Sequence, residues 1–261
     1  MKIVACIKQV PDTKEVRIDP ETGTMIREGV PSIINPFDLY AVETALQLKE
    51  RFGGEVIVVT MGPPQAAEAL KDTIAMGADN AILISDRAFA GSDTLATSYT
   101  IAKAIEKIGG VDLVITGKQA IDGDTAQVGP GVAVNLDAPF IAFIGKIEDA
   151  TEKTLTVARL MEDGHDILEV SLPAVISVVK EIGEPRLPSV RGKMRANKFQ
   201  PTVWKAADIA ADEKRIGLSG SPTQVAKIFT PKSRGKGQML QAETADQYAE
   251  MVAEKLGSFL G

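Results

Sequence analysis

The stretch "VDLVITGKQAIDGDTAQVGP", residues 111–130, carries the strongest indication of the fold of this chain. Residues 111–117 read as a buried strand, because they form a mostly apolar run that ends at a glycine. The 14 residues from 117 to 130 then hold three glycines, two aspartates, two glutamines and a threonine. A simple connection needs neither this backbone freedom nor this hydrogen-bonding capacity. We therefore predict that the loop binds a ligand; the alternative is a long turn capped by its own aspartates.

The regions before this stretch alternate between strand patterns and helix patterns. Continuous apolar runs are typical of strands in a parallel sheet that is covered on both faces, and alternation with helices indicates βαβ units with right-handed crossovers. We predict an α/β fold with a doubly wound, mostly parallel, Rossmann-like sheet. The expected strands are 2–10, 55–64, 80–86 and 111–117, the expected helices are 35–52, 65–79, 92–110 and 125–137, and residues 16–29 are expected to form a surface hairpin.

The pattern changes after residue 139, where strand-like runs follow one another without helices. We expect residues 139–182 to extend the sheet as a β-meander, with His165 on an exposed turn and without a catalytic role. Residues 185–240 read as irregular, and an amphipathic helix ends the chain. A compact domain rarely carries so long an irregular segment, and this one is richer in apolar residues than disordered segments are. We predict an α/β domain over 1–184 and an arm with a helix over 185–261 that packs on a partner subunit.

Composition excludes several classes of function. The 261 residues have a formal net charge of −6, which argues against nucleic-acid binding, and no apolar run reaches the roughly 18 residues of a membrane span. The N-terminus lacks the features of a signal peptide, so we expect a cytoplasmic protein. The single cysteine, Cys6, and the single histidine exclude an internal disulfide and the usual metal sites. The sequence has no Walker A motif, no dinucleotide fingerprint and no evident catalytic pair, which favours a cofactor-binding chain over one with catalytic residues.

Three predicted strands end in segments that combine polar and turn residues, namely 6–11, 60–64 and 117–130. Ligands of open α/β sheets bind at the carboxyl ends of strands, where the strand order reverses. The N-terminus of the helix after the loop favours an anion such as phosphate. In this hypothesis Gly117, Gly123 and Gly129 allow close backbone approach, Thr125 and Gln127 donate to phosphate, and Asp122 and Asp124 cap the loop or bind ribose hydroxyls.

Five segments together resemble the small, beta subunit of electron transfer flavoproteins, and the resemblance runs nearly from end to end. They are "IKQVPD" (7–12), "NPFDLYAVETALQLKE" (35–50), "AMGAD" (75–79), "LVITGKQAIDGDTAQVGP" (113–130) and "LPAVISV" (172–178). The resemblance implies an α/β domain in a heterodimer with a larger alpha subunit, which carries a redox-active FAD. It also implies that the beta subunit holds AMP, or a second FAD in the electron-bifurcating members.

The resemblance assigns nucleotide contacts to particular positions, many of them through the backbone. These are Cys6, Asn35, Pro36, Phe37, Asp38, Met61, Gly117, Lys118, Gln119, Ala120, Ile121, Asp122, Gly123, Asp124, Thr125, Ala126, Gln127 and Val128. Cys6 and Met61 would then line the crevice and would not be reactive.

We expect FAD in this crevice, with AMP as the alternative. The small residues at 123, 125 and 126 leave room for a longer ligand, and the segments 191–196 and 220–231 look like those of the bifurcating members. The chain would then pass electrons between a hydride donor, a dehydrogenase of the acyl-CoA type or similar, and a low-potential acceptor. A nucleotide-sensing stress-type module without redox function is the alternative from another class.

The segment "RLPSVRGKMRANK", residues 186–198, has no acidic residue in an acidic protein. It matches the region that recognises dehydrogenases in the family, although its sequence departs from that of the AMP-binding members. We predict that it docks a partner dehydrogenase; the alternative is a solvated basic loop. The expected docking residues are Leu187, Val190, Arg191, Lys193 and Arg195.

Overall fold

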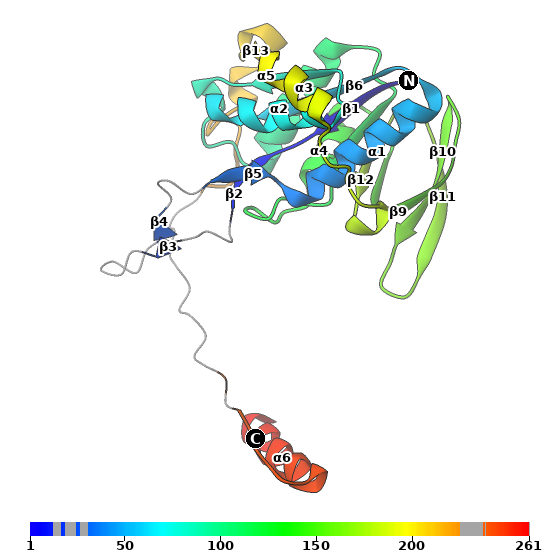
Figure 1. Cartoon of the computed structure of the whole chain (residues 1–261). Coiled ribbons are helices and arrows are strands. Elements are labelled where there is room, and N and C mark those ends of the chain that lie inside the picture. The colour runs from blue at the N-terminus through cyan, green and yellow to red at the C-terminus, as the bar shows by residue number, and fades with distance from the viewer. Residues whose placement is uncertain (13–16, 19–24, 27–30, 225–236, 238, 261) are drawn as a thin grey trace.

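The computed structural model describes residues 1–12, 17, 18, 25, 26, 31–224, 237 and 239–260 (Figure 1). Within that part of the chain one nine-stranded sheet forms the centre of the molecule. Its strands lie side by side in the order β11 (His165–Ser171), β10 (Thr154–Leu160), β9 (Phe140–Ala150), β12 (Ala174–Val178), β8 (Leu113–Gly117), β1 (Lys2–Cys6), β6 (Glu55–Met61), β7 (Asn80–Ile84) and β13 (Thr202–Trp204).

The strand order reverses between β1 and β8, as the doubly wound prediction requires. From β1 the chain moves to β6 and β7 on one side, and then crosses to β8 on the other side, with all of these neighbours parallel. Alternate residues of β1 belong to opposite cores, with Ile3 and Ala5 in one and Val4 and Cys6 in the other. Burial on both faces explains why these strands read as continuous apolar runs.

Helices cover both faces of the sheet. The face that holds Ile3 packs against α1 (Pro36–Phe52) and α2 (Ala67–Met76), and the face that holds Val4 packs against α3 (Thr94–Ile108) and α4 (Val128–Asn135). Short 3-10 helices are η2 (Pro64–Ala66), η3 (Arg87–Phe89), η4 (Lys180–Ile182), η5 (Ala207–Ile209) and η6 (Glu213–Arg215). The predicted strands and helices before residue 138 are confirmed, except that α4 is shorter than expected and the strand predicted for 2–10 ends at Cys6, since Gln9–Pro11 belongs to a separate strand outside the main sheet.

Two small antiparallel pairs lie outside the main sheet. β2 (Gln9–Pro11) pairs with β5 (Ser32–Ile34), and β3 (Arg17–Ile18) pairs with β4 (Met25–Ile26). The second pair agrees with the hairpin predicted for residues 16–29, whose turn lies outside the described residues.

The prediction of a meander is right for β9, β10 and β11 and wrong for β12. The first three strands are antiparallel neighbours, whereas β12 turns back into the sheet and lies parallel to both β9 and β8. The burial of each strand explains its place, because all five residues of β12 are buried while β11 is mostly exposed at the edge. His165 is exposed and is the first residue of β11 rather than part of the turn.

The segment expected to be irregular contains a helix and a strand. α5 (Val190–Lys198) packs on α2, and β13 pairs parallel with β7 at the edge of the sheet. Residues 225–236 and 238, including most of the segment 220–231, lie outside the described part. The last helix, α6 (Ala245–Leu260), lies apart from the sheet and its covering helices (Figure 1). Packing of residues 185–261 on a partner subunit stays a prediction.

Candidate functional site

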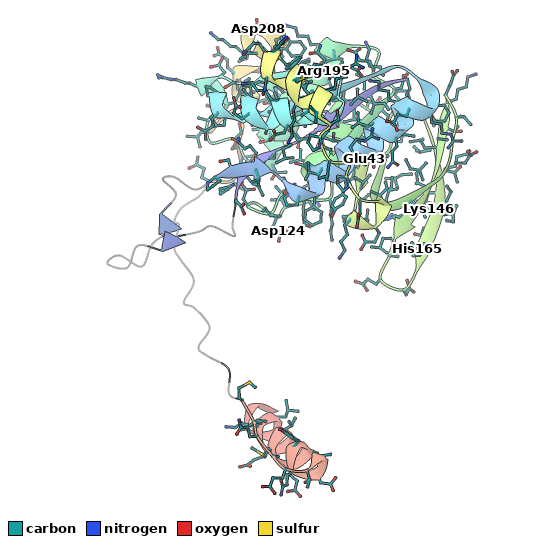
Figure 2. All side chains as sticks on the ribbon, in the orientation of Figure 1. Glu43, Asp124, Lys146, His165, Arg195 and Asp208 are labelled. Atoms are coloured by element: carbon teal, nitrogen blue, oxygen red, sulfur yellow. The ribbon has the colours of Figure 1, made fainter. Side chains whose placement is uncertain are left out.

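A cleft of about 540 Å³ opens at the carboxyl ends of β1, β6 and β8. This volume is within the usual range of small-molecule sites, about 300–1,000 Å³. One wall is the loop from Gly117 to Ala126 with the start of α4, and a second wall is the start of α3. Figure 2 shows Asp124 in this loop at the carboxyl edge of the sheet, whereas His165 lies on the distant β10–β11 hairpin. The three strand ends therefore meet at one site, as the sequence predicts.

Gly117 allows α1 to approach the end of β8 closely. A Cβ atom at this position would lie 2.6 Å from the carbonyl carbon of Phe37 and would overlap the carboxylate of Asp38. Real Cβ contacts are never this short, so a larger residue would push α1 away from the sheet. The glycine thus brings the start of α1 to the floor of the cleft.

Asn35 holds the loop from behind. Its fully buried side chain donates from Nδ2 to the carbonyl oxygen of Gln119 (2.8 Å) and accepts at Oδ1 from the backbone N–H of Ile121 (3.1 Å). Asn35 is the N-cap residue of α1 by position, but its side chain forms no hydrogen bond with the helix, because that side chain is used on the loop. Asp124 and Ala126 have left-handed backbones, with φ of 54° and 55°. The loop is therefore ordered by the protein itself.

Burial shifts the pKa of two ionisable groups at the floor of the cleft. Burial raises the pKa of Asp38 to about 7, although hydrogen bonds from the Asn35 side chain and from the backbones of Lys8 and Gly117 oppose the shift. Burial, with a smaller contribution from the Asp38 charge, raises the pKa of the Cys6 thiol to about 12. Cys6 is therefore a protonated lining residue and not a reactive thiolate.

The start of α3 supplies the wall that sequence reasoning missed. Asp93 caps the helix, since its Oδ1 accepts from the N–H groups of Leu95 (2.9 Å) and Ala96 (3.1 Å). The hydroxyl of Thr94 lies 3.2 Å from that of Thr125 and joins the two walls. The wall consists of Ser92, Asp93, Thr94, Thr97 and Ile101. A helix that follows a parallel strand begins at the carboxyl edge of the sheet, but only the strand order shows that α3 faces β8.

The structure brings most of the predicted contact residues to the cleft. Those that line it are Cys6, Asp38, Met61, Gly117, Lys118, Gln119, Ala120, Gly123, Asp124, Thr125, Ala126 and Val128. Asn35, Pro36, Phe37, Ile121, Asp122 and Gln127 are not among its lining residues; Asn35 supports the loop, and Asp122 forms an ion pair with Lys8 (2.6 Å). Gly129, predicted to allow close backbone approach, also lines it, and Ile7, Lys8 and Thr116 line it without having been named as contacts.

The arrangement suits a ligand with phosphate and hydroxyl groups. The first turn of α4 presents N–H groups without partners inside the helix, at its positive end. The buried Oγ1 of Thr116, a lining residue, has no hydrogen-bond partner within the protein. In the described part of the chain no three His, Cys, Asp or Glu residues are grouped to hold a metal. No described helix is long and apolar enough to cross a membrane.

Comparison with known proteins gives consistent matches. Residues 22–209 match the electron transfer flavoprotein domain. The chain is 51% identical over 257 residues to the caffeyl-CoA reductase-Etf complex subunit CarD of Acetobacterium woodii, covering 98% of both chains. It is 48% identical over 254 residues to the electron transfer flavoprotein subunit beta of Clostridium acetobutylicum, covering 97% of both. It is 47% identical over 265 residues to the same subunit of Megasphaera elsdenii, covering 98% of both.

Proposed function

Because the chain belongs to the electron transfer flavoprotein family, among its beta subunits, we propose that its cleft holds FAD and that it takes part in flavin-based electron bifurcation. Electron transfer is the role of the family, and it sets aside the alternative of a nucleotide-sensing module. The observation that carries the proposal is the cleft itself, with two polar walls at the point where the strand order reverses. When bound, the flavin would supply the redox chemistry.

The wall made by the loop and α4 fits the AMP moiety of FAD. The first turn of α4 and the hydroxyl of Thr125 would bind phosphate, and the carboxylate of Asp124 would accept from ribose hydroxyls. The left-handed residues at 124 and 126 hold this backbone in place before the ligand arrives, which lowers the cost of binding. The residues of this chain bind and orient the cofactor.

The wall made by α3 favours FAD over AMP. Thr94 and Thr97 are three residues apart on the helix, so both side chains lie on the same face, toward the cleft. Ile101 and Met61 add apolar surface beside them. A ligand that ended at its first phosphate would leave this second wall without a partner, whereas FAD extends beyond the AMP moiety. AMP remains the alternative, since it would occupy the same loop.

The alpha subunit is the partner that we propose for α6. All described residues of this helix are exposed except Met251, which is half-buried. Tyr248, Val252 and Leu256 lie at helical spacing and form an apolar face. An exposed apolar face of this kind commonly marks a surface that contacts another protein.

We further propose that α5 and the residues before it dock a dehydrogenase. Leu187, Val190 and Met194 are 89%, 79% and 62% exposed, in a segment that is otherwise basic. Arg195, included among the predicted docking residues, has another contact, since its guanidinium donates to the carbonyl oxygens of Ile74 and Ala78 at the end of α2. Leu187, Val190, Arg191 and Lys193 remain the residues for docking.

The experiment is to co-express the chain with its alpha subunit and to extract the nucleotides from the purified heterodimer. Two FAD and no AMP per heterodimer is the expected result. One FAD with one AMP would contradict bifurcation and leave a conventional electron carrier. A colourless complex without flavin would contradict the electron-transfer role.

A further inference from the structure

Phe143 in β9 has a backbone conformation that is unfavourable for its residue type. Its φ is 59°, in the left-handed region that bulky side chains rarely adopt. Such strain persists only where the surrounding structure enforces it, and it is often found at functional sites.

A β-bulge enforces this conformation. Ile176 of β12 lies opposite Ile141, and Val178 lies opposite Ile144, so that two residues of β9 face the single residue Ser177. The N–H of Phe143 donates to Oγ of the buried Ser177 over 3.1 Å. Bulges commonly change the direction of a side chain beside a functional site.

The bulge lies next to the cleft. Val178 of β12 also pairs with Gly117, the last residue of β8, which immediately precedes Lys118. The ammonium of Lys118 lies 5.2 Å from the centre of the Phe143 ring, within the range of a cation–π interaction. Lys118 lines the cleft, and Phe143 is not among the lining residues.

The two lysines of the cleft differ in their partners. Lys8 forms an ion pair with Asp122 over 2.6 Å, whereas Lys118 forms no ion pair with any residue that the structure describes. An aromatic ring attracts an ammonium group without neutralising its charge. The charge of Lys118 is therefore held in position and stays available to an anion.

We propose that Phe143 is a positioning residue, which holds the Lys118 ammonium at the cleft for a phosphate group of the ligand. This inference rests on the proposed nucleotide site and deepens it. It explains why a strained aromatic residue stands at this bulge: the left-handed backbone directs the ring beneath Lys118. The ligand in this proposal is a phosphate ester. The Lys118 ammonium makes the site bind a nucleotide more tightly than the nucleoside that lacks the phosphate.

The test compares AMP with adenosine, which share the base and ribose and differ in the phosphate. Calorimetric titrations use the nucleotide-stripped complex with the alpha subunit. Phe143→Leu should weaken AMP binding about 2- to 5-fold, the fold-change that an exposed cation–π contact gives, and should leave adenosine binding unchanged. Phe143→Tyr should restore AMP binding. Lys118→Gln should weaken AMP binding further and reduce its dependence on salt.

Two further variants separate positioning from folding. Phe143→Gly removes the ring and relieves the backbone strain, which offsets part of the packing that this half-buried side chain loses, so the variant should stay folded, while its AMP binding should weaken as in Phe143→Leu. Lys146→Gln removes an exposed lysine of the same strand (Figure 2) and should change neither ligand. Equal effects of Phe143→Leu on AMP and adenosine, or no effect on either, would overturn the inference. A wild-type complex that binds neither ligand would overturn the proposed nucleotide site and this inference with it.

Discussion

Asn35 connects the start of α1 to the loop that forms one wall of the cleft. Substitution by alanine leaves the carbonyl of Gln119 and the N–H of Ile121, both in half-buried residues, without these partners, and the loss of two such hydrogen bonds costs about 1–3 kcal/mol. We expect Asn35→Ala to lower the free energy of unfolding by roughly this amount and to weaken nucleotide binding at least tenfold. The matched control is Gln47→Ala, an exposed amide of α1. Unchanged nucleotide affinity in Asn35→Ala would show that the loop holds its shape without this clamp.

Asp38 should make the free energy of unfolding depend on pH. The pKa of its carboxyl is about 7 in the folded protein and 3.8 as the ordinary value. Between these values the folded state binds the proton more tightly than the unfolded state, so stability falls as pH rises from about 4 to about 7 and then levels off. The loss is at most on the order of 4 kcal/mol, since one pKa unit is worth about 1.4 kcal/mol. Thermal unfolding of complexes at pH 5 and pH 8 should show a smaller difference for Asp38→Asn than for the wild type; equal differences would argue against the shift.

The element α5 is held to α2 by close backbone contact. A Cβ atom on Gly192 would overlap the carbonyl oxygen of Ala75, so Gly192→Ala should displace α5 and destabilise the protein by about 1–3 kcal/mol. Gly164→Ala is the control, because an added Cβ there meets no atom within 4 Å. Urea unfolding of the two variants should differ by this amount. Equal stabilities would mean that α5 is packed more loosely than its contacts indicate.

The exposed face of α5 carries the docking prediction. Val190→Asp should slow electron transfer to the dehydrogenase, because it places a charge within the apolar contact. Arg191→Glu should lower the association rate and reduce its dependence on salt. Stopped-flow kinetics at two salt concentrations measure both effects. If neither variant changes the rate, α5 is not the contact surface.

Some elements can be predicted from the sequence and others cannot, for physical reasons. β1, β6, β7 and β8 were predictable because burial on both faces makes each strand a continuous apolar run. β12 was misplaced because its neighbours in the sheet lie far away in sequence. α5 was missed because its sequence is polar and its position depends on Gly192, on Arg195 and on the bonds of Arg186 to Glu43 and Glu50. The loop 117–130 was recognisable by its residues, whereas the α3 wall depends on strand order.

At the scale of the whole molecule, the structure indicates which segment of the chain needs a partner subunit to cover it. Residues 185–224 include α5, which packs on α2, and β13, which pairs with the sheet, whereas α6 lies apart from both and carries an uncovered apolar face. In the chain alone, limited proteolysis should remove α6 and leave the α/β body intact, because cleavage requires an exposed segment. In the heterodimer α6 should be protected. Equal cleavage in both samples would show that α6 is not covered by the alpha subunit.

The central claim is that the cleft at the ends of β1, β6 and β8 holds a flavin nucleotide. The most direct test counts the FAD extracted from heterodimers that carry Gly117→Ala, because a Cβ at this position would displace the start of α1, which forms the floor of the cleft. Gly164→Ala heterodimers serve as the control. The account predicts two FAD per heterodimer in the wild type and the control, and one in Gly117→Ala, namely the FAD of the alpha subunit. Two FAD retained in an intact Gly117→Ala heterodimer would contradict it.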